Sequence, residues 1–161
     1  MFSNLAHSPI GWIHVVASVV AVIVGTQVLW STKGTRAHKR IGYLYTASMI
    51  AVNITAFLIF RLFGGFGPFH IAAVVSSLTL LAGMVPVLLR TRFKNWFVLH
   101  MSFMYYSVIG LYAALASETI VRIPGIRFWW SVMGATLLVM LIGILAFNRQ
   151  MKKWQAQFEK L

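Results

Sequence analysis

Five histidines are the side chains in this chain best suited to bind a metal ion or a haem. Four of them fall on long apolar segments that we expect to cross a membrane: His14, His38, His70 and His100. An ionisable side chain within a bilayer is costly, and its presence there indicates a function by default. His14 and His70 lie toward one membrane face, and His38 and His100 lie toward the other. This spacing favours two metal centres in series.

The composition indicates an integral membrane protein. Of 161 residues, 60% are hydrophobic and 10% are charged, and the mean hydropathy of +0.82 lies outside the range of soluble domains. Five apolar segments are long enough to cross a hydrocarbon core of about 30 Å. We place these spans near residues 9–30, 41–63, 69–89, 96–117 and 126–148. The sequence therefore predicts an all-α membrane protein with a single domain over residues 1–161.

Short connections make consecutive helices antiparallel neighbours, so we expect a four-helix bundle with the fifth helix packed outside it. In such a bundle the first and third helices face each other diagonally across the core, and so do the second and fourth. At a rise of 1.5 Å per residue, the two diagonal histidine pairs lie at levels about 20 Å apart. Each level then has one pair of imidazoles from opposite helices.

The net charge of +12 is explained by the positions of the basic residues. Eleven of the fourteen fall on one side of the predicted spans: Lys33, Arg36, Lys39, Arg40, Arg90, Arg92, Lys94, Arg149, Lys152, Lys153 and Lys160. The positive-inside rule places this side in the cytoplasm, with the amino terminus outside and the carboxyl terminus inside. We expect the basic tail over 149–161 to continue the fifth helix along the anionic inner leaflet. The bilayer therefore accounts for the charge, and no nucleic acid is expected as a partner.

The remaining inventory of reactive side chains excludes several kinds of chemistry. Cysteine and aspartate are absent, which excludes disulfides, thiolate metal sites and iron–sulfur clusters. The two glutamates lie far apart in the topology, with Glu118 at the outer end of the fourth helix and Glu159 in the tail. A paired-carboxylate mechanism is therefore excluded within one chain.

Two imidazoles that face each other across a bundle are common axial ligands of haem b. We expect His14 and His70 to hold an outer haem, and His38 and His100 to hold an inner one. Gly42 follows His38 by one helical turn on the same face, where it leaves room for a macrocycle. The leading hypothesis is a small cytochrome b-like redox protein that passes electrons across the membrane. A quinone or a redox partner protein is a candidate partner, and an oxidoreductase activity stays open.

Two other classes of function fit the same residues. Zinc or copper could bind through the membrane histidines, above all at the outer face, where His14 and His70 would be joined by His7 and Glu118. A helical structural or assembly subunit without a cofactor needs each histidine only as an interfacial residue or a helix cap. A strong Soret absorbance band distinguishes haem from both alternatives.

Four segments of the chain resemble the prokaryotic predicted membrane proteins classed as domain of unknown function 2306. They cover residues 13–27, 33–45, 67–81 and 95–111 and include the motif H-x-x-x-G-x-x-Y at His38, Gly42 and Tyr45. The resemblance spans about residues 10–116 and implies a prokaryotic inner or plasma membrane, with no established activity. In layout alone, the chain is more distantly similar to the di-haem membrane cytochromes b, which include transmembrane ascorbate and ferric reductases.

Overall fold

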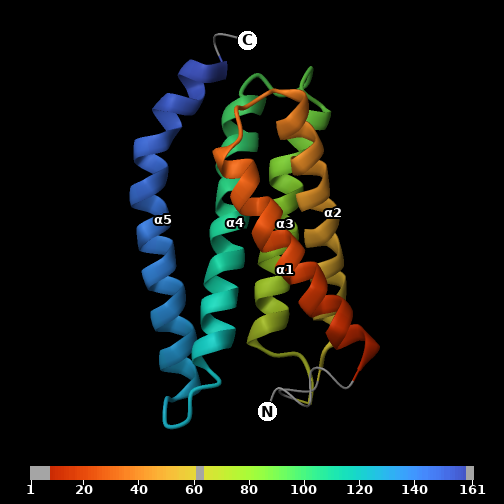
Figure 1. Cartoon of the computed structure of the whole chain (residues 1–161), viewed down its shortest axis with the longest axis vertical. Coiled ribbons are helices and arrows are strands. Elements are labelled where there is room, and N and C mark those ends of the chain that lie inside the picture. Colours follow the sequence, from red (N-terminus) through yellow and green to blue (C-terminus); the bar gives the residue numbers. More distant parts are fainter. Residues whose placement is uncertain (1–7, 61–63, 159–161) are drawn as a thin grey trace.

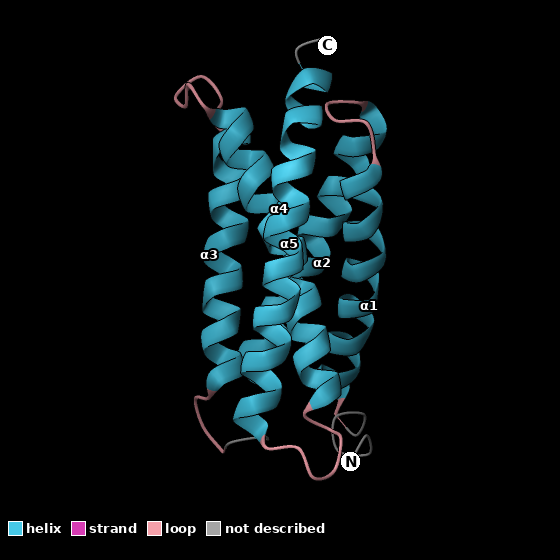
Figure 2. Cartoon of the chain, turned by 90° about the vertical axis from the view of Figure 1, so that its left-hand side faces the viewer, coloured by secondary structure: helices cyan, strands magenta, loops and turns pink. Residues whose placement is uncertain are grey.

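The computed structural model describes residues 8–60 and 64–158, and within them the secondary structure is entirely helical (Figure 1, Figure 2). The helices are α1 (Pro9–Trp30), α2 (Arg36–Leu58), α3 (Pro68–Leu88), α4 (Trp96–Ile120) and α5 (Phe128–Phe158). All five are long and apolar enough to cross a membrane. The predicted fold class, an all-α membrane protein with five transmembrane helices, is confirmed.

The first four helices form a closed ring of neighbours: α1 contacts α2, α2 contacts α3, α3 contacts α4, and α4 contacts α1. Within these helices the backbones of the diagonal pairs, α1 with α3 and α2 with α4, do not come into contact. α5 packs against α4 along the outside of this bundle (Figure 1). The long axes run roughly together, and the loops gather at the two ends (Figure 2).

The two ends differ in charge. We call the end with loops 31–35 and 89–95 and the last turns of α5 the basic end, which is at the top of Figure 1. The opposite end holds the start of α1, the start of α3 and the loop from α4 to α5. α2 and α4 both begin at the basic end, so they run parallel to each other across the bundle diagonal.

Local capping explains where the helices begin. Ser8 precedes α1, and its Oγ accepts a hydrogen bond from the Gly11 N–H at 3.1 Å, which satisfies one of the free donors of the first turn. Thr35 Oγ1 does the same for the His38 N–H at 3.2 Å. α2 therefore starts at Arg36, earlier than the expected boundary at 41, and His38 lies within its first turn.

Two helices also extend beyond the expected spans. α4 continues to Ile120, and α5 continues through the basic segment to Phe158 as one helix. The last turns of α5 return to the bundle, because the Trp154 ring is only 7% exposed and packs with Tyr105 of α4 at a centroid distance of 5.7 Å.

The core between the four helices contains one buried cross-link. Tyr45 of α2 is completely buried, and its hydroxyl makes a hydrogen bond of 2.8 Å with Ser107 Oγ of α4. Gly25 of α1 makes room for the ring, since a Cβ at this position would lie 2.9 Å from it. Most other large apolar side chains face outward, as expected where lipid replaces water as the surroundings.

Candidate metal centre at the basic end

His38 and His100 meet at the basic end of the bundle. Their ring centroids are 6.4 Å apart, and the ring planes are nearly perpendicular, at 89°. His38 and His100 are 62 residues apart in the sequence, and so are Tyr45 and Ser107. The hydrogen bond between Tyr45 and Ser107 lies two turns further along both helices. Because α2 and α4 are parallel, this buried hydrogen bond and the histidine contact share one register. The predicted inner pair is therefore brought together.

The hydrogen bond at Nδ1 of His38 defines its tautomer. Ser31 Oγ donates to the Val28 carbonyl at 2.9 Å, so the same oxygen accepts from Nδ1–H of His38 at 3.0 Å. A neutral imidazole that donates through Nδ1 keeps a free lone pair on Nε2. His38 can therefore bind a metal through Nε2.

His100 has the same tautomer, fixed by a different partner. Its Nδ1 lies 2.8 Å from the carbonyl oxygen of Gly83 on α3, and a carbonyl can only accept. Gly83 allows this approach because a Cβ there would lie 2.7 Å from Met104 Sδ and 3.2 Å from the Met104 backbone nitrogen. Sequence reasoning missed Gly83 and Ser31, whose roles depend on contacts between different segments.

A buried lysine accompanies the pair. Lys33 is 2% exposed, and its Nζ donates to the Val28 and Leu29 carbonyls at 2.8 and 2.9 Å. The ammonium lies 4.8 Å from the centroid of the Trp154 ring. Burial lowers the pKa of Lys33 to about 8. It lies close enough to both His38 and His100 to act on them electrostatically. From the sequence alone Lys33 was interpreted as a topology marker, since its burial has no signal in the sequence.

At the opposite end, His14 also keeps a free lone pair on Nε2. Thr55 Oγ1 on α2 donates to the Ala51 carbonyl at 2.7 Å, so it accepts from Nδ1–H of His14 at 2.8 Å. His14 is half-buried against α2 rather than facing the diagonal helix α3.

His70 has the opposite tautomer. Its Nδ1 accepts from the Gly67 N–H at 3.1 Å, which puts the proton on Nε2. Ligation of a metal through Nε2 requires the other tautomer and the loss of this hydrogen bond. In residues 8–60 and 64–158, no ring contact or hydrogen bond joins His70 to His14. The role of these two residues as ligands of an outer haem stays a prediction, and the hydrogen bond at Nδ1 of His70 opposes it.

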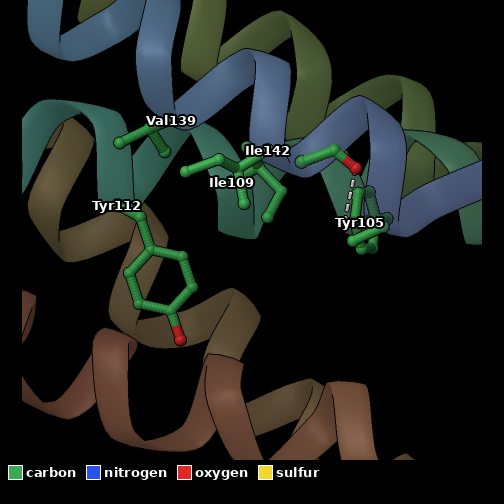
Figure 3. A pocket seen from close by; sticks show the side chains of 7 residues that line it. Tyr105, Ile109, Tyr112, Val139 and Ile142 are labelled. Atoms are coloured by element: carbon green, nitrogen blue, oxygen red, sulfur yellow. Dashed lines mark hydrogen bonds between the residues drawn. The ribbon is translucent and has the colours of Figure 1, made fainter.

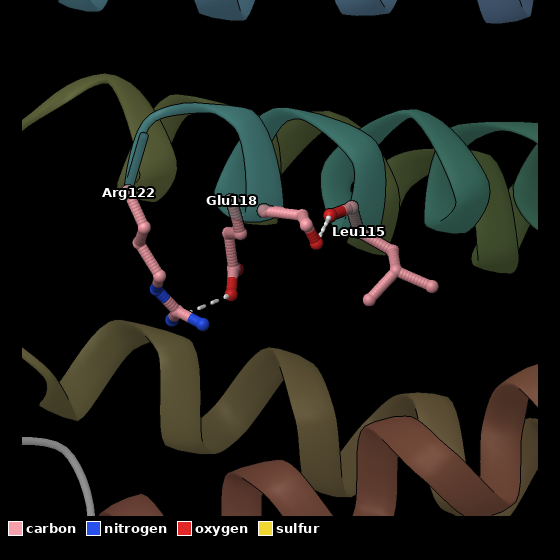
Figure 4. Close-up of polar contacts among 4 residues, drawn as sticks. Leu115, Glu118 and Arg122 are labelled. Atoms are coloured by element: carbon pink, nitrogen blue, oxygen red, sulfur yellow. Dashed lines mark hydrogen bonds and ion pairs between the residues drawn. The ribbon is translucent and has the colours of Figure 1, made fainter. Parts of the chain in front are cut away.

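The residues of the alternative outer metal site that the structure describes are His14, His70 and Glu118. Glu118 pairs with Arg122 one turn along α4, at 3.7 Å (Figure 4). Among the residues that the structure describes, no group of three or more histidines and acidic residues lies close enough to hold a metal ion. His7 lies outside the described residues.

Gly42 lies at the contact between α2 and α1. A Cβ at Gly42 would have one neighbour within 4 Å, Val28 Cγ2 of α1 at 3.8 Å. This is an ordinary van der Waals distance, so the position tolerates an alanine. Its expected place beside an inner cofactor stays a prediction.

An open apolar groove of about 290 Å³ lies between α4 and α5, with Tyr105 and Tyr112 on its α4 side (Figure 3). Tyr105 donates its hydroxyl proton to the Gly143 carbonyl at 2.8 Å. Tyr112 donates to Thr26 Oγ1 of α1, whose own proton goes to the Val22 carbonyl. Both hydroxyl protons are therefore engaged, and the groove presents a carbon surface to the bilayer.

Comparison with known proteins places the chain in a family. The family described as "Predicted membrane protein (DUF2306)" matches residues 11–145, which include the four membrane histidines and the greater part of α5. No curated protein and no solved structure matches the chain. The resemblance found in the sequence is confirmed, and the chain belongs to the DUF2306 family of predicted membrane proteins.

Proposed function

We propose that this protein is a membrane redox protein that binds one haem at the basic end, through Nε2 of His38 and Nε2 of His100. The observation that carries the proposal is the meeting of two imidazoles from diagonal helices, with centroids 6.4 Å apart and Nδ1 of each ring hydrogen-bonded to an oxygen. No residue beyond these two is needed as an axial ligand.

The separation of the rings fits one shared iron. A metal–nitrogen bond is about 2 Å long and the ring centroid lies about 1.2 Å behind the nitrogen, so two imidazoles on opposite sides of one metal have centroids about 6.4 Å apart. The rings are perpendicular, which this arrangement permits because each ring can rotate about its own bond to the metal.

The number of ligands favours haem over a bare ion. A structural zinc takes four ligands and a catalytic zinc takes three from the protein, whereas a haem in a bis-histidine site takes two. Within the described segments no third histidine or acidic residue joins the pair. Copper or zinc at the same two nitrogens remains the alternative that the experiment below distinguishes.

The residues around His38 and His100 would orient the two imidazoles and balance the charge of a bound haem. Ser31 and the Gly83 carbonyl hold Nδ1–H of the two imidazoles, and such partners fix the tautomer and the ring orientation of metal-binding histidines. Lys33 places a buried positive charge beside them. Arg36 and Arg40 on the first turns of α2 are candidates for pairing with haem propionates. The bound haem would supply one-electron chemistry.

The hydrogen bonds of the histidines support one haem per chain rather than two haems in series. The proton on Nε2 of His70 removes one of the two ligands of the outer centre. We further propose that the basic end is cytoplasmic, in a prokaryotic inner or plasma membrane, on the strength of the charge distribution.

The test is the absorbance spectrum of the purified protein, with haem titrated into it. We expect a Soret band at one haem per chain, lost in His38→Ala and in His100→Ala and retained in the matched control His14→Ala. No Soret band in the wild-type protein, before or after titration with haem, overturns the haem assignment. Stoichiometric zinc or copper that is lost in the same two variants would replace haem by a compact ion at the same site.

A further inference from the structure

We propose that the opposite end of the bundle carries a separate binding site, in which Nε2–H of His70 donates a hydrogen bond to a carbonyl oxygen of a membrane-resident amphiphile. This site shares no residue with the pair at the basic end. Its existence does not depend on the proposed haem.

The first observation is an unpartnered donor in a buried position. His70 is 4% exposed, and Nε2 has no hydrogen-bond partner within residues 8–60 and 64–158. The Gly67 N–H occupies Nδ1 at 3.1 Å, so the proton of the neutral ring lies on Nε2. Buried polar groups in folded proteins nearly always have a partner. A buried N–H therefore points to an acceptor that the described part of the chain does not supply.

The second observation concerns what surrounds this imidazole. Phe60 stacks against the ring at a centroid distance of 4.7 Å, with the planes 27° apart. Phe66 approaches the ring at 5.1 Å and 30°. A buried water needs two to four polar partners, whereas these neighbours are carbon surfaces. A single acceptor atom carried by an apolar molecule suits one N–H between aromatic rings.

The third observation is the position of the site in the fold. His70 lies in the first turn of α3, Phe60 follows the end of α2, and Phe66 lies in the loop between them. The ends of membrane-spanning helices lie near the boundary between hydrocarbon and headgroups. Two kinds of carbonyl reach this depth, the ring carbonyl of a membrane quinone and the ester carbonyl of a phospholipid. Both are acceptors on largely apolar molecules.

The experiment measures the carbonyl itself. Purified protein in nanodiscs receives, in one arm, decyl-ubiquinone labelled with ¹³C at its ring carbonyls. In the other arm the nanodiscs contain phosphatidylcholine labelled at its ester carbonyls. We expect a downshifted infrared carbonyl band in one arm, which identifies the source. A hydrogen bond of this kind should contribute about tenfold to affinity.

Three variants make the test specific. His70→Phe keeps an aromatic ring between the two phenylalanines but has no N–H, and we expect it to lose the shifted band. His70→Gln keeps a donor near the place of Nε2, and we expect it to retain the band. His14→Phe is the control at the same end and should behave as the wild type, while haem content stays unchanged in all three.

A second measurement keeps the proposal testable if His70→Phe fails to fold. The ¹⁵N spectrum of histidine-labelled wild-type protein should show one ring protonated at Nε2, with its signal shifted on adding the probe that gave the infrared band. Nε2 found unprotonated, or no response of either carbonyl in the wild-type protein, overturns the proposal.

Discussion

Replacing Gly83 by alanine tests the link between helix packing and the histidine pair. The new methyl group would lie 2.7 Å from Sδ, 2.9 Å from Cγ and 3.2 Å from the backbone nitrogen of Met104. The methionine side chain can turn away, but the backbone nitrogen can retreat only if α4 moves. We therefore expect α3 and α4 to separate by a few tenths of an ångström at this contact.

The expected loss of stability follows from two opposing effects. Inserting a methyl group into a close-packed contact costs about 1–3 kcal/mol, and replacing a helical glycine by alanine returns about 0.5–1 kcal/mol. The net destabilisation should be about 0–2.5 kcal/mol. The hydrogen bond of 2.8 Å from His100 to the Gly83 carbonyl crosses the same contact. Its disruption should weaken haem binding by about tenfold or more, as for other partners of ligating histidines.

The assay is reversible unfolding in mixed micelles, followed by titration of each variant with haem. Gly110→Ala is the matched control, because nothing lies within 4 Å of a Cβ at that position of α4. Gly42→Ala, with its single contact at 3.8 Å, should gain about 0.5–1 kcal/mol of stability like Gly110→Ala and leave haem binding unchanged. Met104→Ala combined with Gly83→Ala should cost less than the sum of the two single substitutions, because removal of Sδ and Cγ relieves the contact with the new methyl group. If Gly83→Ala proves as stable as Gly110→Ala and binds haem as tightly, the reasoning is refuted.

Three further outcomes are expected. Tyr45→Phe removes the buried hydrogen bond to Ser107 and should lower the free energy of unfolding by about 0.5–1.5 kcal/mol, with no further loss when Ser107→Ala is added. Burial lowers the pKa of Lys33 from 10.5 to about 8, so the unfolded chain binds this proton more strongly than the folded chain. The free energy of unfolding should therefore rise between about pH 8 and about pH 10.5. Lys33→Met should abolish this rise, and the same dependence on pH in the variant would contradict the prediction. Reporters fused after Gly34 and after Gly125 should lie on opposite sides of the membrane, with the first in the cytoplasm; the same location for both would refute this orientation.

The helices could be predicted because each contains an apolar run of membrane-spanning length. The start of α2 was missed for a physical reason. Its first turn carries Arg36, Lys39 and Arg40, and a search for apolar residues passes over a polar turn that Thr35 caps. The continuation of the fifth helix through its basic tail was predicted correctly, since α5 runs to Phe158.

The candidate site was only partly predictable. The rise per residue placed His38 and His100 at one level, and the diagonal of the bundle brought their rings together. Height along a helix says nothing about rotation around it, which is why His14 at a suitable level turns to Thr55 of α2 instead. The burial of Lys33 depends on Trp154, which is far away in the sequence.

The partner of Nδ1 decides what each histidine can do, and this partner comes from the fold. At His14, His38 and His100 an oxygen accepts the Nδ1 proton, so Nε2 is left as a base or a ligand. At His70 a backbone N–H of the first helical turn donates to Nδ1, so Nε2 is left as a donor. A helix start supplies free N–H groups, whereas Ser31 and Gly83 supply oxygens near helix ends. His70 folds back on an N–H at the start of its own helix, whereas His38, also in a first turn, contacts an oxygen from another segment. The same residue type is therefore left with a donor at Nε2 in one case and an acceptor in the other.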